Sequence, residues 1–300
     1  MKNTFTILAL SAFILSSCCA GKKLEEVKQR LGEIKKGQVL ELDRVSTIGN
    51  TSFTKLAEIK LDSIINSRIQ ARLRKAKTGL DSVNAIIESI SQLLASKKEF
   101  RNNYRTVILP ALLNLENYRK LYNIRQQAYL MLEDGLDITN YTLFDLAAFF
   151  GPGKYQIPEE ARELASKSFA PMVDSVIKFS NKYKELPRKA SLVILGFADG
   201  TGFAAGSDLY NTLAGLMGKS EASNPELNQK LSELRAAELV KMLSRQFVIR
   251  DKTLENKESF GVEYLQQGKG EQYPIPTIKD YRVDDERRRI VLCYWAVIPD

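Results

Sequence analysis

The stretch Ala190-Ser191-Leu192-Val193-Ile194-Leu195-Gly196-Phe197-Ala198-Asp199-Gly200-Thr201-Gly202 decides the fold of the C-terminal half of this chain. The apolar run Ala190–Leu195 predicts a buried β-strand, and the glycines that follow predict a turn that carries Asp199. Further along, Asn228-Gln229-Lys230-Leu231-Ser232-Glu233-Leu234-Arg235-Ala236 predicts the start of a helix that carries Arg235. An aspartate and an arginine on one rim can bind a zwitterion through its ammonium and carboxylate groups.

Strands and helices are predicted to alternate on both sides of this stretch. The helix after the strand Ala190–Ala198 covers Leu227–Gln246, and the helix before it runs from Ile157 to about Tyr183. Three further strands are predicted: Ile138–Phe150, which Gly151-Pro152-Gly153 ends, Phe260–Leu265 and Ile290–Val297. The order β-α-β-α-β-β predicts an α+β sandwich with a mixed sheet and helices on one face.

Four motifs of this region resemble the OmpA-like peptidoglycan-binding domain of bacterial envelope proteins. They are, in the order of that family, Gly196–Gly202, Asn228–Ala236, Gly268-Lys269-Gly270-Glu271 and Arg288-Arg289-Ile290. The resemblance implies non-covalent binding of the diaminopimelate in the peptidoglycan stem peptide, with no bond made or broken.

The resemblance also implies a role for each matched residue. Asp199 corresponds to the aspartate that receives the ammonium of diaminopimelate, and Arg235 to the arginine that binds its carboxylate. Asn228 corresponds to an asparagine at the helix start that lines the same pocket, where it would cap the helix. Arg288 and Arg289 correspond to the arginine pair before the last strand, and one of them would face the pocket while its neighbour faces away.

The chain departs from the family pattern at two places. Ala198 stands where the family has a threonine, and an insertion of about residues 203–226 separates Asp199 from the helix of Arg235. Within the insertion, Asn211 lies in a segment that also resembles the one preceding the Leu-Ser-x-x-Arg motif, although only Asn228 has the family's spacing from Arg235. The apolar segment Leu209–Met217 predicts a helix that acts as a lid, a partner surface or a block.

The N-terminus resembles a bacterial lipoprotein signal. Lys2 precedes the apolar run Phe5–Leu15, which is too short to anchor stably across a membrane, and Leu15-Ser16-Ser17-Cys18 resembles a lipobox. Residues 1–17 would be removed and Cys18 acylated, while an ordinary cleavable signal peptide is the alternative. Since Cys19 is not an aspartate, the resemblance implies the periplasmic side of the outer membrane.

The region between the anchor and the sandwich is predicted to be a linker followed by helices. Residues 18–50 read as the linker, with Gly37 and Gly49 in a connector. Residues 51–135 form the helical region, in which a second helix covers about Tyr104–Leu132. A heptad seam predicts a hairpin, a kinked stalk or a self-associating coiled coil; its members are Ile69, Leu73, Ala76, Leu80, Val83, Ile87, Ile90 and Leu94. The sandwich then spans residues 138–300.

The composition excludes several classes of function. The chain contains no histidine, so Ser–His and Cys–His nucleophiles are impossible within it, and we expect no metal or other cofactor. Its net charge is +8, but 44 basic and 36 acidic residues are interleaved, which argues against a nucleic-acid partner. Of the three cysteines, Cys293 falls in a predicted strand as a small buried residue.

The sequence leaves three functions to compare. The first is a lipid-anchored protein that links the outer membrane to the cell wall. The second is a scaffold of an envelope complex that no longer binds peptidoglycan and uses the insertion or the helices to contact proteins. The third is a wall hydrolase with paired acids such as Glu159/Glu160 or Asp284/Asp285. We expect no enzyme, because adjacent acids at a helix start or in a loop are usually solvated.

Overall fold

The computed structural model describes residues 3–138, 141–145 and 154–300, and it describes side chains from Gly21 onward except that of Asp145. The chain divides into two compact units. The helical unit contains Met1–Asn50 and Gln70–Tyr129, and the sheet unit contains Thr51–Ile69 and Leu130–Asp300. The predicted leader and Cys18 lie outside the part whose side chains are described. Over the described residues, no helix combines the length and the apolar character that crossing a bilayer requires.

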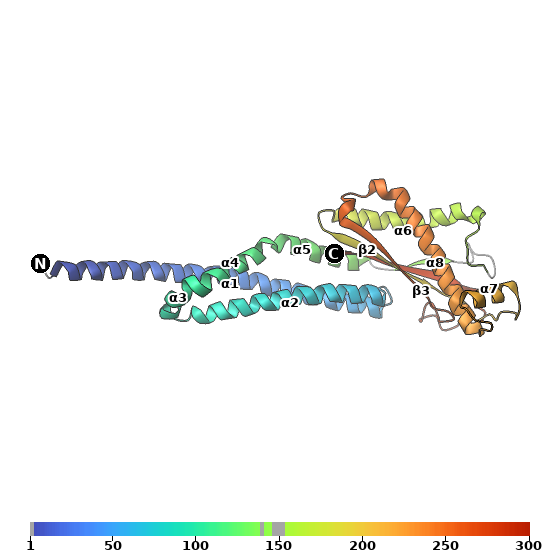
Figure 1. The fold of residues 1–300 in the computed structure, drawn as a ribbon, viewed down its shortest axis with the longest axis horizontal. Coiled ribbons are helices and arrows are strands. Elements are labelled where there is room, and N and C mark those ends of the chain that lie inside the picture. Colours follow the sequence, from blue (N-terminus) through green and yellow to red (C-terminus); the bar gives the residue numbers. More distant parts are fainter. Residues whose placement is uncertain (1–2, 139–140, 146–153) are drawn as a thin grey trace. The chain divides into compact units, whose positions relative to one another are not determined.

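The helical unit consists of long helices connected by short turns (Figure 1). The elements that contribute to it are α1 (Asn3–Ala57), α2 (Ser63–Leu93), α3 (Lys97–Asn103), the π-helix η1 (Tyr104–Ile108), α4 (Leu109–Lys120) and α5 (Tyr122–Ile138). A long helical hairpin, formed by α1 and α2, therefore precedes the sheet. A hairpin was predicted, but between the seam helix and the helix over Tyr104–Leu132 and not with the residues before Thr51.

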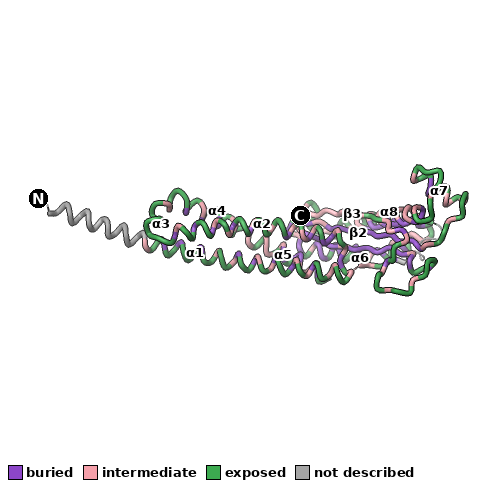
Figure 2. The backbone as a smooth tube through the Cα atoms, turned by 90° about the horizontal axis from the view of Figure 1, so that it is seen from below, coloured by how far each residue is buried: buried purple, intermediate pink, exposed green. Residues whose placement is uncertain are grey.

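The predicted linker over residues 18–50 is wrong, because α1 runs through it as a continuous helix. Buried residues recur along α1 at steps of three, four or seven, which is a heptad seam (Figure 2). They are Leu24, Val27, Leu31, Gln38, Glu41, Val45 and Ile48. At Gly32 and Gly37 a Cβ would meet no neighbouring atom, so these glycines occupy open positions of the helix.

The helix predicted over Tyr104–Leu132 is divided into segments. Pro110 stands in the first turn of α4, directly after the π-helix, and the helix is interrupted again at Leu121. Proline lacks the N–H that an uninterrupted helix would donate, which accounts for the change of hydrogen-bonding pattern before it. These segments still pack on the hairpin, since Ile108, Leu112 and Leu115 share one apolar cluster with α1 and α2.

The sheet unit has the predicted order of strands and helices. It contains β1 (Tyr141–Asp145), α6 (Glu159–Lys182), β2 (Arg188–Gly196), α7 (Asp208–Leu216), α8 (Asn224–Arg250), β3 (Phe260–Gly268) and β4 (Ile290–Pro299), with 3-10 turns at Asp251–Thr253, Lys257–Ser259 and Glu286–Arg288. The four strands lie in the order β1-β4-β2-β3, in which β2 and β3 are parallel and the other pairs antiparallel. The α+β class and the mixed sheet are thus confirmed. Part of the predicted strand Ile138–Phe150, residues 139–140 and 146–150, lies outside the described residues.

One face of the sheet packs against α6 and α8. Arg188 of β2 donates from Nε to Ser180 Oγ of α6 at 2.6 Å, and the ring of Tyr264 meets that of Phe247 of α8 at 6.3 Å. Residues two apart in a strand share a face. The even-numbered residues of β2, including Leu192 and Ile194, therefore form the core under these helices.

The prediction that helices lie on one face only is wrong, because residues 51–69 cover the other face. Arg68 donates from Nη1 to Ser191 Oγ at 2.8 Å and from Nη2 to Glu263 Oε1 at 2.7 Å. On the same face, Tyr294 Oη donates to the Ile59 carbonyl at 3.3 Å. The end of α1 and the start of α2 consequently belong to the sheet unit, whereas the sequence had assigned them to a separate helical region.

Candidate functional site

The candidate site lies where β2 and β3 end and α8 begins. A Cβ at Gly196 would lie 2.2 Å from the carbonyl oxygen of Ser232, and one at Gly268 would lie 2.6 Å from Ser232 Oγ. Only glycine permits such close contact between a strand and the helix that covers it. The glycines of two motifs therefore set the distance between α8 and the ends of both strands.

Hydrogen bonds tie the loops of this region together. Ser232 Oγ donates to the Gln229 carbonyl at 2.8 Å and accepts from the Gly270 N–H at 2.9 Å. The Ala198 N–H donates to the Gly270 carbonyl at 2.8 Å. The loop that carries Asp199 is thereby fixed beside the loop that follows β3. Since this bond uses the main chain, alanine at position 198 preserves it.

Asp199 is buried, with 7% of its surface exposed. Its Oδ2 accepts from Arg289 Nε at 2.7 Å, lies 2.6 Å from Arg289 Nη2 and accepts from Thr201 Oγ1 at 2.8 Å. No role was predicted for Thr201. Its hydroxyl, two residues after Asp199, supplies a side-chain donor in the loop where Ala198 has none. Three donors therefore hold one carboxylate oxygen in place.

Arg235 lies deeper in the same region and is 5% exposed. Its Nε donates to the Lys154 carbonyl at 3.2 Å. Burial lowers the pKa of Arg235 to about 10, the nearby Asp199 opposes this shift, and the positive charge of Arg289 adds to it. The guanidinium is still charged at neutral pH, so the site holds two arginines around one aspartate.

Asn228 faces the site but does not cap its helix. Helix α8 begins one turn earlier, with Ser223 at its N-cap, where the Ser223 N–H donates to Glu226 Oε2 at 2.9 Å. The predicted capping role of Asn228 is therefore wrong. Its buried Nδ2 instead donates to Glu271 Oε1 at 2.8 Å and to the Thr201 carbonyl at 3.3 Å.

The structure also separates the two asparagines that the sequence left open. Asn211 lies on the exposed surface of α7 and donates from Nδ2 to the Gly206 carbonyl at 3.1 Å. Asn228, by contrast, joins the Asp199 loop to the loop after β3. Of the two, Asn228 is the one that the fold brings to the candidate site.

The two arginines before β4 point to different partners. Arg289 binds Asp199, while Arg288 is buried and donates from Nη1 to the carbonyls of Val283 at 2.8 Å and Arg282 at 3.2 Å, and from Nη2 to that of Glu271. Arg288 therefore holds the loop between β3 and β4, and Arg289 supplies the charge beside Asp199. Thr201, Glu271 and Ser232 complete the site without having been predicted, although all three stand inside the motifs.

The insertion folds onto the first turns of α8. Leu213 and Ala214 of α7 pack on Leu227 and Leu231 of α8 in one apolar cluster. The predicted helix over Leu209–Met217 is thus present as α7. Leu216 remains 53% exposed at its end.

Three of the four acids considered for catalysis, Glu159, Asp284 and Asp285, form ion pairs with nearby arginines. Glu159 forms an ion pair with Arg162 in the first turn of α6. Asp285 accepts from the Arg287 N–H at 3.0 Å and pairs with the Arg287 side chain at 2.6 Å, and this hydrogen bonding holds the pKa of Asp285 well below its usual range. Asp284 pairs with Arg282 at 3.7 Å. In the described part of the chain, no three Cys, Asp or Glu side chains gather as a metal site.

No protein-family model matches this chain, and no curated protein matches it either.

Proposed function

We propose that this chain is a lipid-anchored envelope protein whose OmpA-like domain binds peptidoglycan through diaminopimelate. The observation that carries the proposal is the convergence of Asp199, Arg235, Arg289 and Asn228 at one end of the sheet. Asp199 follows β2, Arg289 precedes β4, and Asn228 and Arg235 lie in α8. Close contacts of Gly196 and Gly268 with α8 hold these segments together.

The charges suit a ligand that bears an ammonium and a carboxylate together. Asp199 Oδ2 is held by Arg289 and Thr201, and we assign Oδ1 to the ligand ammonium. Arg235 then binds the adjacent carboxylate. A charge-assisted pair of this kind contributes about 1.5–3 kcal/mol.

The anchor completes the proposed function. Cys18 carries the acyl chains on the periplasmic side of the outer membrane, and the site holds the wall, so the protein connects the two. Two or more acyl chains give durable attachment because each buried CH₂ contributes about 0.8 kcal/mol.

The test is co-sedimentation with purified peptidoglycan, using residues 18–300 with Cys18→Ser so that no acyl chain contributes. This chain is preferable to a fragment starting at residue 138, because residues 51–69 cover one face of the sheet. Asp199→Ala and Arg235→Ala are expected to weaken pelleting about 10- to 100-fold. Asp208→Ala on α7 and Arg245→Ala on α8 remove the same residue types from exposed positions and are expected to pellet normally.

A competition experiment makes the result independent of any folding defect in the variants. Free meso-diaminopimelate is expected to displace the unmutated protein from the wall, and cadaverine, which has both ammonium groups but no carboxylate, is expected to do so far less. Equal competition by both, or no pelleting of the unmutated protein, would refute the proposal.

The alternative is a scaffold that retains the fold without binding the wall. The observation in its favour is that Arg289 already occupies Asp199, while α7 adds the exposed Leu216 beside the site. If the unmutated protein stays in the supernatant, Leu216→Asp would be the variant to test for loss of an envelope partner.

A further inference from the structure

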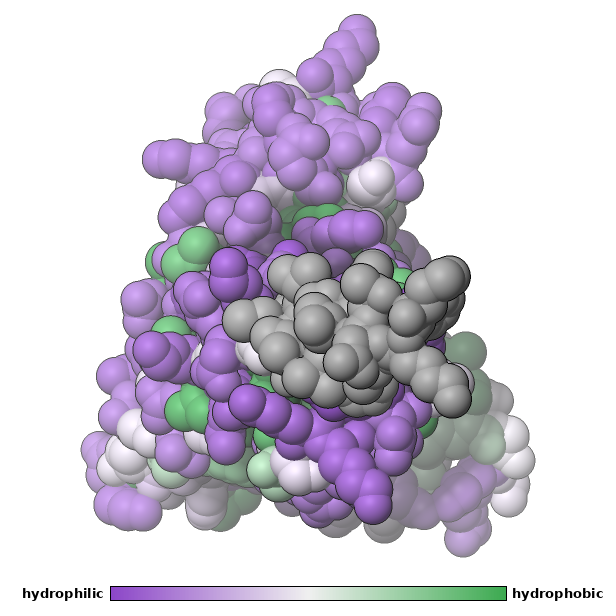
Figure 3. All heavy atoms as spheres, turned by 90° about the vertical axis from the view of Figure 1, so that its left-hand side faces the viewer, coloured by the Kyte–Doolittle hydropathy of each residue, from purple (hydrophilic) through white to green (hydrophobic). Residues whose placement is uncertain are grey.

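Basic side chains gather at the end of the helical unit where Leu24 of α1 packs beside the turn between α2 and α3. We call this group the tip patch. Lys22 and Lys23 come from α1, and the other members come from α3 and η1; all six are exposed: Lys22, Lys23, Lys97, Lys98, Arg101 and Arg105. Figure 3 looks onto the molecule from this end, and hydrophilic side chains predominate there.

Packing, rather than sequence proximity, brings the two parts of the tip patch together. Leu24 of α1 shares an apolar cluster with Leu94 and with Phe100 of α3. Lys23 Nζ lies 4.6 Å from the centroid of the Tyr104 ring. The turn between α2 and α3 is thereby held against the first packed turn of α1. The lysines of both segments are exposed and therefore lie at the same end of the helical unit.

The acids near the tip patch are largely engaged elsewhere. Glu25 pairs with Lys28 at 3.1 Å, and Glu26 pairs with Arg30 at 2.8 Å. Both partners follow these acids in α1, further along the helix from Lys22. Between Lys97 and Ile108 the sequence contains one acid, Glu99, against four cations. The tip patch therefore carries an excess of positive charge.

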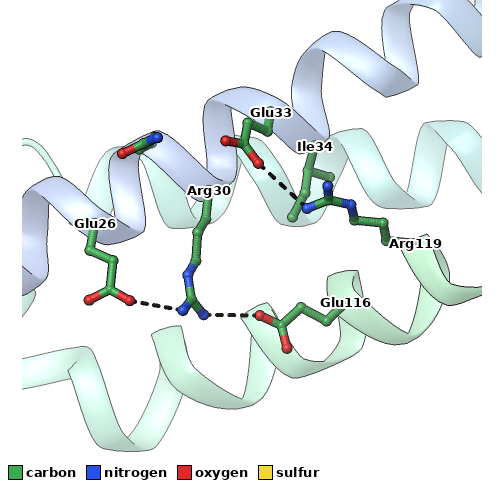
Figure 4. A pocket seen from close by; sticks show the side chains of 7 residues that line it. Glu26, Arg30, Glu33, Ile34, Glu116 and Arg119 are labelled. Atoms are coloured by element: carbon green, nitrogen blue, oxygen red, sulfur yellow. Dashed lines mark hydrogen bonds and ion pairs between the residues drawn. The ribbon is translucent and has the colours of Figure 1, made fainter.

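The next part of the same unit shows what a balanced surface looks like. Arg30 lies between Glu26 and Glu116 at 2.8 and 3.2 Å, and Arg119 pairs with Glu33 at 3.5 Å (Figure 4). There each cation faces an acid across the helices. The tip differs from this balanced surface, because its cations outnumber its acids.

The tip patch lies close to the proposed lipid anchor. Lys22 follows Cys18 by four residues, which corresponds to about 6 Å along a helix. A protein held at Cys18 would thus present the patch within about one Debye length of the headgroups.

We propose that the tip patch binds the phosphate groups of anionic phospholipids in the membrane that holds the anchor. This inference rests on the proposed lipid anchor for its location, but the binding itself needs no acyl chain. Each lysine or arginine near an anionic membrane surface contributes to attraction, and the contribution falls steeply with salt. The patch would hold the helices at the membrane surface while the sheet unit binds the wall.

The experiment measures partition of residues 18–300 with Cys18→Ser onto vesicles of phosphatidylglycerol and phosphatidylcholine mixed equally, and onto pure phosphatidylcholine. The test variant is Lys97→Gln/Lys98→Gln/Arg105→Gln. The matched control is Arg74→Gln/Lys75→Gln/Lys77→Gln, which removes two lysines and one arginine from exposed positions of α2. Circular dichroism checks that both variants keep their helices.

We expect binding to the anionic vesicles in 0.05 M salt, loss of about 100-fold in the test variant and less than about 3-fold in the control. Salt at 0.5 M is expected to abolish binding in all of them. Equal partition onto neutral vesicles, or equal loss in test and control variants, would overturn the proposal. Peptidoglycan pelleting of the test variant is expected to be unchanged, so failure at the membrane and failure at the wall give different results.

Discussion

Two buried carboxylates, Glu41 in the helical unit and Asp199 in the sheet unit, are each paired with an arginine, but the pairs differ in their balance. Glu41 is 2% exposed, and both of its oxygens accept from Arg125 at 2.9 Å, while Tyr129 Oη lies 3.4 Å from Oε2. Arg125 also stacks on Tyr118 with its Cζ 3.5 Å from the ring centroid. One acid and one arginine thus satisfy each other.

Asp199 instead has two arginines beside it, and its contacts with Arg289 and Thr201 all fall on Oδ2. We call Glu41 and Arg125 the closed pair, because their charges balance, and a pair of this kind adds specificity to a fold. We call Asp199, Arg235 and Arg289 the unbalanced cluster, because two arginines surround one aspartate, and such a cluster retains the capacity to interact with another charged group. The difference separates a pair that serves the architecture from a cluster suited to a ligand.

The largest effect is expected from breaking the closed pair. Arg125→Ala would leave Glu41 buried without its cation and would remove the donor to the Tyr118 carbonyl. We expect the free energy of unfolding of the helical unit to fall by about 3–5 kcal/mol, measured by chemical denaturation. Arg119→Ala, which removes an exposed partner of Glu33, is expected to change it by less than about 0.5 kcal/mol. Equal losses would contradict the distinction, and neither variant should change wall binding.

A somewhat smaller loss of stability is expected from disturbing the contact between β2 and α8 that positions the unbalanced cluster. In Gly196→Ala the new Cβ would clash with the main chain at Ser232, and we expect a loss of about 3 kcal/mol together with weaker peptidoglycan pelleting. Gly261→Ala in β3 places its Cβ 3.6 Å from the flexible Lys189 side chain and is the control. A Gly196→Ala protein as stable as the control would show that α8 does not depend on this close contact.

Removing one arginine of the cluster is expected to have a smaller effect than Arg125→Ala. In Arg289→Gln, Asp199 keeps Thr201 and the field of Arg235, so we expect about 1–2 kcal/mol of destabilisation by chemical denaturation. Arg282→Gln on the same loop, whose side chain is 78% exposed, is expected to lose less than about 0.5 kcal/mol.

The double variant Arg235→Gln/Arg289→Gln sharpens this comparison. It would leave Asp199 without either cation, so its destabilisation should exceed the sum of the two single changes. Strict additivity would mean that the arginines do not share the aspartate.

The smallest effect concerns alkaline pH in the closed pair. Burial, with the charge of Glu41 second, raises the pKa of Tyr118 to about 12, above the value of about 10 in an unfolded chain. The associated stabilisation is complete below about pH 10 and is lost as the pH rises to about 12, because the unfolded chain releases the proton first. Tyr118→Phe should reduce the fall in the free energy of unfolding between pH 9 and pH 11 by under about 1 kcal/mol, measured by chemical denaturation at both pH values.

Much of the sheet unit was predictable from the sequence because its signals are local. The apolar run ending at Gly196 and the apolar alternation in β4 predict strands by themselves, and the order of four motifs indicates which ends meet. The resemblance to the OmpA-like domain selected Asp199, Arg235, Asn228 and Arg289, and the structure brings them together.

Other features depend on contacts between distant segments. The seam in α1 was not predicted, because Gln38 and Glu41 occupy core positions that apolar residues usually hold. Their partners, the Leu80 carbonyl and Arg125, lie on other helices. Arg288 and Arg289 are adjacent and chemically identical, so only the turn Glu286–Arg288 decides which of them reaches Asp199.

The sequence by itself thus determined the strands and helices of the sheet unit from β1 to β4 and the set of charged residues available for a site, because apolar periodicity and residue type are local properties. Only the tertiary structure decided that residues 51–69 cover the second face of the sheet, that Glu41 is neutralised and that Asp199 is shared. Each of these depends on burying a polar group, and burial is favourable only where a particular distant partner compensates the lost hydration.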